Sequence, residues 1–179
     1  GKFEEALPSA ELLLVLPKPE IPRWQEISHG TAFENIKTTS GGDTRFESVK
    51  AGLRLIESEG VVGVHDAVRP FVSIEAIQTT FNKAKSTGAA IPVVDLKDSI
   101  RKVDSDQSVA VNRSNFIIVQ TPQCFDVNVL KQAYQQVFNS SFTDDASVVE
   151  ADGKKVSLVK GNYSNIKITT IEDLKIAEI

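Results

Sequence analysis

Short apolar runs alternate with helical patterns along this chain, and this alternation constrains the fold more than any other feature. Strands are predicted at Ile36–Thr39, Val61–His65 and Ala89–Val94, with helices between them at Arg45–Glu59 and Ser73–Ser86. Such βα units place helices over both faces of a sheet. The sequence therefore predicts an α/β domain with a doubly wound, mostly parallel, Rossmann-like sheet.

The remaining patterns extend this alternation toward both ends of the chain. They predict strands over 11–17, 156–160 and 165–169, helices around 20–27, 126–138 and 144–151, and a final helix from residue 172. Residues 2–7 resemble the last turns of a helix that no strand precedes. Because an α/β nucleotide-binding domain usually opens with a strand and a glycine-rich loop, we expect a single domain over 1–179 that is incomplete at its N-terminus.

One excursion, between Leu96 and Gln120, interrupts the alternation. Strand patterns at 99–103 and 108–111 flank the turn-forming residues Asp104, Ser105 and Asp106, which predicts a β-hairpin. A hairpin cannot lie flat in a parallel sheet, and one with alternating apolar side chains usually packs on a partner. We therefore expect residues 96–120 to form a projecting arm through which the chain makes a homodimer.

Composition narrows the class of protein. Hydrophobic residues make up 41% and charged residues 25% of 179 residues, as in ordinary globular domains. The net charge of −4 argues against nucleic acid as a partner. The longest aliphatic run, Leu12–Leu16, is too short to span a membrane. Cys124 is the single cysteine, which suits a reducing cytoplasm and predicts a buried, inert thiol.

The segment after the predicted strand Val61–His65 carries the clearest chemical signal. Open α/β sheets bind ligands beyond the carboxyl ends of their strands. Asp66 lies there, and a carboxylate can hold a divalent cation. Arg69, three residues later, can hold an anion, so the pair suggests a substrate that bears phosphate. Asp66 could equally cap a turn or a helix, and His65 fits an orienting role better than that of a base.

Other candidate residues have both a structural and a functional interpretation. Gly41-Gly42-Asp43 with Ser48 could meet a base or ribose, or could be a plain turn before a helix capped by Thr44 and Glu47. Thr143 could bind an anion or act as a helix N-cap. Lys167 and Arg113 could bind phosphate or could be solvated surface charges.

Taken in order, these motifs resemble the 2-C-methyl-D-erythritol 4-phosphate cytidylyltransferases of the non-mevalonate isoprenoid pathway. The resemblance covers about three quarters of the chain and rests on Gly41-Gly42-Asp43-Thr44-Arg45 with Ser48-Val49 and Gly52-Leu53, His65-Asp66-Ala67-Val68-Arg69-Pro70, Ile91-Pro92-Val93 with Asp98-Ser99, Asn112-Arg113, Gln120-Thr121-Pro122-Gln123, Thr143-Asp144-Asp145-Ala146-Ser147, and Asn165-Ile166-Lys167-Ile168-Thr169 with Asp173-Leu174.

The resemblance implies a nucleotidyltransferase reaction. The phosphate of methylerythritol phosphate attacks the α-phosphate of CTP in line, and pyrophosphate leaves. Because the nucleophile is already an anion, positioning and charge neutralisation must supply the rate. The resemblance also implies a Mg²⁺ ion held in part by Asp66, with Lys167 stabilising charge near the α-phosphate.

The remaining candidates receive roles from the same resemblance. It implies that Gly42, Asp43, Ser48 and Ala67 bind the nucleotide, and that Arg69 and Thr143 join Lys167 in the substrate site, with Arg69 organising the turn at Asp66. It implies that Ser99 and Arg113 belong to the arm and reach into a neighbouring subunit. The family usually has threonine at the position of Ser99, so the hydroxyl is kept.

One departure from the family keeps alternatives open. The family begins with a strand and a glycine-rich loop whose arginine and lysine hold the triphosphate, and this sequence has no counterpart, so the chain as given could be inactive. A ribitol 5-phosphate cytidylyltransferase shares nearly all of these motifs. A catalytically silent subunit that binds a nucleotide sugar is a further alternative.

Overall fold

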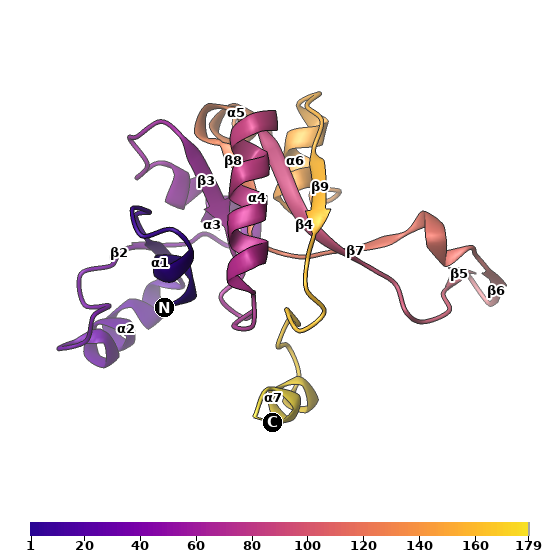
Figure 1. Ribbon diagram of the computed structural model, residues 1–179, viewed down its shortest axis with the longest axis horizontal. Coiled ribbons are helices and arrows are strands. Elements are labelled where there is room, and N and C mark those ends of the chain that lie inside the picture. Colours follow the sequence, from indigo (N-terminus) through magenta and orange to yellow (C-terminus); the bar gives the residue numbers. More distant parts are fainter. Residues whose placement is uncertain (179) are drawn as a thin grey trace.

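The predicted alternation of strands and helices is present in the computed structural model, which describes residues 1–178 (Figure 1). In chain order the elements are α1 (Lys2–Ala6), β1 (Leu13–Leu16), the 3₁₀ helix η1 (Lys18–Glu20), α2 (Ile21–Ser28), β2 (Lys37–Ser40), α3 (Arg45–Leu53), β3 (Val61–Val64), α4 (Ile74–Thr87), β4 (Ala89–Asp95), β5 (Arg101–Asp104), β6 (Gln107–Ala110), the 3₁₀ helix η2 (Arg113–Asn115), β7 (Ile117–Val119), β8 (Gln123–Asp126), α5 (Val127–Ala133), α6 (Asp145–Ala151), β9 (Ser157–Lys160) and α7 (Ile171–Ala177).

The central sheet has the strand order β3–β8–β4–β7, and β9 pairs with β4. β9 is parallel to β4, whereas β8 is antiparallel to both β3 and β4, and β7 is antiparallel to β4. Strands β3, β4 and β9 therefore point in one direction, and the β7–β8 segment runs against them. β1 and β2 form a separate parallel pair. The predicted α/β class with a mainly parallel sheet is confirmed; the reversed β7–β8 segment was not predicted.

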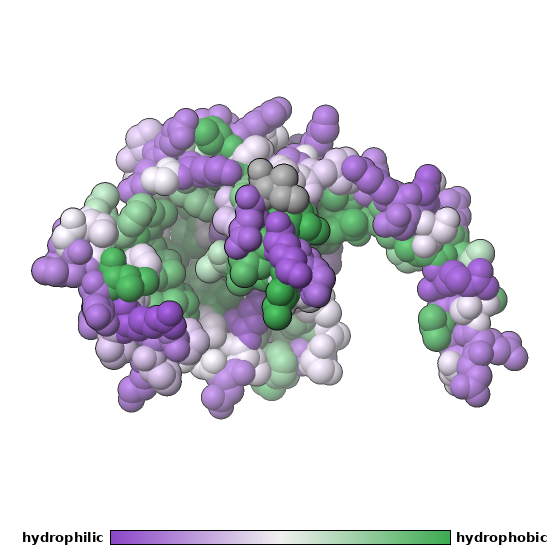
Figure 2. All heavy atoms as spheres, turned by 90° about the horizontal axis from the view of Figure 1, so that it is seen from below, coloured by the Kyte–Doolittle hydropathy of each residue, from purple (hydrophilic) through white to green (hydrophobic). Residues whose placement is uncertain are grey.

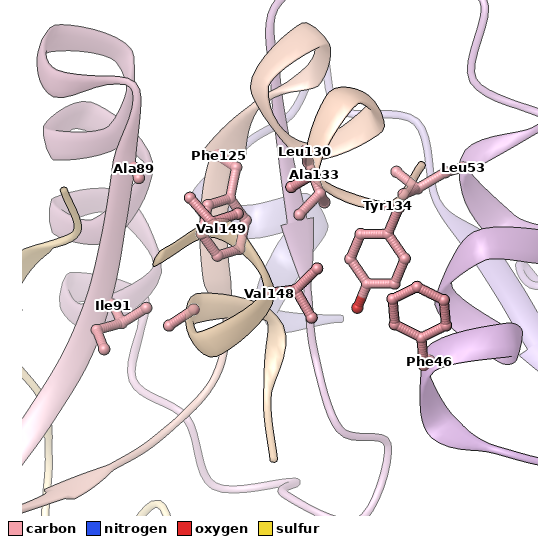
Figure 3. Packing of buried hydrophobic residues seen from close by; sticks show 11 residues of the cluster. Phe46, Leu53, Ala89, Ile91, Phe125, Leu130, Ala133, Tyr134, Val148 and Val149 are labelled. Carbon is pink, nitrogen blue, oxygen red and sulfur yellow. The ribbon is translucent and has the colours of Figure 1, made fainter. Parts of the chain in front are cut away.

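Helices cover both faces of this sheet. Since neighbouring residues on a strand face opposite sides, each strand contributes side chains to both layers of packing. Ala89, Ile91 and Phe125 pack in one cluster with α3, α5 and α6 (Figure 3). Ala90 and Cys124 instead pack with Ala84 of α4. In Figure 1, α4 accordingly lies in front of the sheet, and α5 and α6 lie behind it. Cys124 is fully buried, as predicted.

Helix α3 positions the loop that follows β2. Thr44 caps its start, and the Glu47 carboxylate accepts a hydrogen bond from the Thr44 backbone, which confirms the predicted capping box. The helix packs on β1, where Gly52 lies close to Val15 and Leu13. It ends at Leu53, earlier than the predicted Glu59, and Ile56 packs against the core from the turn that follows. In that turn the N–H groups of Leu55 and Ile56 donate to carbonyls three residues back, at Gly52 and Leu53.

The predicted arm extends away from the body of the molecule (Figures 1 and 2). β5 and β6 pair as an antiparallel hairpin around Ser105 and Asp106. Val103 and Val109 are 70% and 59% exposed in this chain. The hairpin itself is therefore confirmed, and the side chains of Val103 and Val109 are exposed to solvent.

Two further sequence predictions of secondary structure are wrong. Residues 165–169 do not form a strand; the half-buried Ile166 and Ile168 alternate with exposed Lys167 as expected, but the backbone bonds to another loop through Ile168 N and Val68 O, 2.9 Å apart, instead of to a strand. The helix predicted over 126–138 ends at Ala133, and Val137 beyond it is 89% exposed. None of the helices within residues 1–178 has the length and apolar content needed to cross a membrane.

Candidate active site

The turn after β3 is held closed by a ring of hydrogen bonds around His65. Its Nε2 donates to the Arg69 carbonyl oxygen, at 3.0 Å, because a carbonyl can only accept. Its Nδ1 then accepts from the Thr121 hydroxyl at 2.9 Å, and Thr121 Oγ1 accepts from the Asp66 backbone N–H at 3.1 Å. Burial lowers the pKa of His65, which keeps the ring neutral. His65 thus orients the turn, as the sequence suggested.

Three cationic side chains surround the Asp66 carboxylate. Arg45 Nε lies 3.5 Å from Oδ1, Arg69 Nε lies 3.5 Å from Oδ2, and Lys167 Nζ lies 3.3 Å from Oδ2. Burial pushes the pKa of Asp66 upward, but attraction to Arg45, Lys167 and Arg69 outweighs it, and the pKa is lowered. Asp66 is therefore an anion in direct contact with three cations.

Strand direction explains why these residues meet. The carboxyl ends of β3 and β9 lie at the same edge of the sheet, and the antiparallel β8 begins there. Lys167 follows β9 through a loop fixed by buried Asn165, whose Nδ2 donates to the Thr121 carbonyl at 2.9 Å. The Asn165 carbonyl in turn accepts from Arg69 Nη1 at 2.9 Å.

A pocket of about 280 Å³ opens at this edge of the sheet. Thr143 lies on its wall, as expected, although Asp144 and not Thr143 is the N-cap of α6. The full set of lining residues is Arg45, Asp66, Arg69, Val119, Gln120, Thr121, Gln123, Thr143, Asp144 and Lys167.

The predicted nucleotide-binding residues are not among those that line this pocket. Gly42 and Asp43 lie between β2 and α3, and the Ser48 hydroxyl accepts from the Gly42 N–H at 3.2 Å. A Cβ atom on Gly42 would lie 2.5 Å from Glu47 Cβ, so the loop requires glycine there. Ala67 lines a separate hollow of about 250 Å³ that shares Arg69 with the pocket.

The two arm residues lie outside the pocket of their own chain. Ser99 and Arg113 are both exposed, and the Arg113 guanidinium donates to the Lys97 carbonyl at the base of the arm. Neither residue is among those that line the pocket with Lys167.

Sequence reasoning missed several pocket residues. Arg45 was considered only as the start of a helix, and Thr121 only as part of a motif. Both belong to segments that carry the family resemblance, and this was the signal that could have identified them. The partner of Arg45, Asp145, lies 100 residues away, so no local pattern connects the two.

The donor set of the pocket constrains any bound metal. Across residues 1–178 no three His, Cys, Asp or Glu side chains gather as a metal-binding group, and Asp66 is the carboxylate at the centre of the cations. Mg²⁺ is commonly held by one or two carboxylates together with substrate phosphates and water. Asp66 fits a site of this kind, in which the substrate completes the coordination.

An α/β sheet whose carboxyl edge gathers a carboxylate and three cations around a pocket is suited to a phosphate-handling enzyme. Solved structures place the fold in the nucleotidyltransferase class. The chain matches 2-C-methyl-D-erythritol 4-phosphate cytidylyltransferase from Thermus thermophilus with a TM-score of 0.82 and 32% identity over 99% of this chain and 85% of that one. It matches 4-diphosphocytidyl-2C-methyl-D-erythritol synthase from Anaerococcus prevotii with a TM-score of 0.86 and 33% identity over 98% of this chain and 80% of that one.

Sequence comparison identifies the family. The model of the 2-C-methyl-D-erythritol 4-phosphate cytidylyltransferase family matches residues 5–179. Proteins of that name from Phocaeicola vulgatus and Bacteroides fragilis are each 48% identical; the matches cover 96% and 98% of this chain and 78% and 80% of the relatives. The chain belongs to the 2-C-methyl-D-erythritol 4-phosphate cytidylyltransferase family.

Proposed function

We propose that this protein joins CTP and 2-C-methyl-D-erythritol 4-phosphate to give 4-diphosphocytidyl-2-C-methyl-D-erythritol and pyrophosphate in isoprenoid biosynthesis. The observation that carries the proposal is the meeting of Lys167, Arg69 and Arg45 around Asp66 in a chain that matches the family over nearly its whole length.

The reaction needs little proton transfer. A phosphate oxygen of the sugar alcohol forms a bond to the α-phosphorus of CTP, and the bond to the β-phosphate bridge breaks as pyrophosphate leaves with the electron pair. We assign Lys167, which lines the pocket, to neutralising the charge that develops on the α-phosphate. Arg69, fixed by the Asn165 carbonyl, keeps the Asp66 turn in place.

Mg²⁺ is the metal that we propose for this site, with Asp66 as its protein ligand. When bound, it would neutralise phosphate charge and orient the transferred group. We assign the cytidine to the loop of Gly42, Asp43 and Ser48 together with Ala67, and the acceptor to Thr143 and Arg69.

The arm completes the site in this proposal. The exposed apolar side chains of the hairpin support a homodimer, because a lone projecting ribbon cannot bury them. Ser99 and Arg113 of one subunit then contact the acceptor phosphate in the other.

A direct assay tests this function. The complete natural protein is incubated with CTP, Mg²⁺ and either methylerythritol phosphate or ribitol 5-phosphate, and pyrophosphate release is measured. We expect release with methylerythritol phosphate. Release with ribitol 5-phosphate alone would change the substrate, and release with neither would leave a silent binding subunit.

A further inference from the structure

Arg45 lies beside Asp66, but its shortest hydrogen bonds go to Asp145. Its Nη1 and Nη2 donate to the two carboxylate oxygens of Asp145 at 2.9 and 2.6 Å, whereas its Nε lies 3.5 Å from Asp66. Paired, parallel bonds of the first kind are the strongest that an arginine forms with a carboxylate. The guanidinium is therefore committed to Asp145, and only its edge is turned toward Asp66.

Asp145 is built into the core as a fixed anchor. Its side chain is fully buried at the first turn of α6. Tyr134, at the end of α5, donates its hydroxyl to Asp145 Oδ1 at 2.6 Å and stacks its ring on Phe46 of α3 (Figure 3). Burial and the neighbouring Asp145 raise the pKa of Tyr134, so that the hydroxyl remains a donor.

The second arginine is held in the same manner. Arg69 Nη1 donates to the Asn165 carbonyl at 2.9 Å, while its Nε is 3.5 Å from Asp66. Each guanidinium thus has a shorter bond to another group than to Asp66. The Asp66 carboxylate is surrounded by cations but forms no short hydrogen bond with either arginine.

Removing Asp145 would change this balance. Arg45 would lose its partner while its edge already lies beside Asp66, and the nearest carboxylate would be Asp66 itself. A guanidinium that turned to form two short bonds there would occupy the oxygens that a cation must reach.

We propose that Asp145 is a positioning residue that ties Arg45 back and thereby keeps the Asp66 carboxylate available to a divalent cation. This inference rests on the proposed function, since it needs Asp66 to hold the metal of the metal–nucleotide complex. Tyr134 acts with Asp145 by fixing the orientation of its carboxylate.

Binding of Mn²⁺ with CTP tests the proposal without any turnover. Water proton relaxation distinguishes manganese nucleotide immobilised on the protein from that in solution, and circular dichroism with thermal melting confirms that each variant is folded. In the complete natural protein, Asp145→Asn should weaken binding of Mn²⁺ with CTP by about 10- to 100-fold, the usual cost of losing a group that supports a metal ligand. Tyr134→Phe removes one hydrogen bond without changing charge and should weaken binding less.

The decisive variant combines Asp145→Asn with Arg45→Gln. If a freed Arg45 captures Asp66, removing the arginine should restore affinity toward that of the unmodified protein, a rescue that general damage to the core would not give. Folded Asp145→Asn protein that binds as well as the unmodified protein overturns the proposal, and so does a double variant as weak as the single one.

The variant Asp66→Asn distinguishes a failure of the role proposed for Asp145 from a failure of the metal role proposed for Asp66. If Asp66→Asn binds Mn²⁺ with CTP weakly and Asp145→Asn binds it normally, only the positioning role of Asp145 is overturned. Unchanged binding by Asp66→Asn would overturn the metal role of Asp66, and the inference with it.

Discussion

Asp66 combines partial burial, with a side chain 15% exposed, and contacts to three cations that are all longer than 3 Å. An anion that only stabilised the fold would be expected to take at least one short bond from these neighbours. The loose contacts are consistent with a carboxylate whose role is completed by a ligand.

We expect Asp66→Asn to leave the fold intact and to lower kcat by about 10²-fold or more, the usual cost of removing a key electrostatic contact. A neutral amide is a poor ligand for a hard cation. Steady-state kinetics of the complete natural protein, with circular dichroism as a control for folding, measure the effect. Near-normal turnover would mean that Asp66 only caps its turn.

Lys167 should matter more to the transition state than to the bound substrates. The side chain is 46% exposed and lies in a loop, so its removal should not disturb the core. We expect Lys167→Ala to lower kcat more than it raises KM. A change confined to KM would assign Lys167 to uniform phosphate binding and would remove it from the proposed mechanism.

Cys124 should resist chemical modification in the folded protein. It lies on β8, fully buried against α4, and burial raises the pKa of its thiol, so that little thiolate forms. We expect iodoacetamide near neutral pH to label Cys124 only as fast as the protein opens, with rapid labelling in denaturant. Mass spectrometry gives both rates, and fast labelling without unfolding would contradict the buried position.

Among the elements, β3 and α4 pack closely where Gly63 faces Phe81. A Cβ atom on Gly63 would lie 2.8 Å from the Phe81 ring and 3.3 Å from Cys124 Sγ. We therefore expect Gly63→Ala to destabilise the protein by about 1–3 kcal/mol through overpacking. Urea unfolding measures this cost.

The matched control for Gly63→Ala makes the neighbouring side chain, Phe81, smaller. Phe81→Leu makes room beside the new methyl group, so the double variant should cost less than the two single changes added together. Additive costs would show that the clash with Phe81 is not the cause.

The sequence predicted local structure well and non-local pairing poorly. The boxes formed by Thr44 with Glu47 and by Thr170 with Asp173 are both present, because a cap depends on residues three apart. β8 was missed because four residues carry too little periodicity, and its partners in β3 and β4 lie far away in the sequence. The arginine–carboxylate pair of Arg45 and Asp145 escaped prediction for the same reason.

At the scale of the whole molecule, the proposed shared site makes a prediction about mixed dimers. If the arm delivers Arg113 to the neighbouring subunit, a heterodimer of Arg113→Ala and Lys167→Ala chains has one site with both defects and one with neither. After subunit exchange we expect activity to recover toward half of normal per heterodimer.

Verified exchange is the control for this mixing experiment. Two differently tagged variants, purified through both tags, give the heterodimer alone. Activity no higher than that of the separate variants would place Arg113 in the site of its own subunit.

The arm and the floor of the pocket belong to one continuous stretch of chain, since β7 returns from the hairpin directly into Gln120, Thr121 and β8. The two ends of this stretch should differ in their tolerance of length variation. Residues added at Ser105 and Asp106, the exposed tip, would lengthen the hairpin and leave the positions of the pocket residues unchanged. One residue added between Val119 and Gln123 would turn each later side chain of β8 to the opposite face of the sheet. Natural variants of this protein should therefore differ in length at the tip of the arm and keep a fixed length at its return.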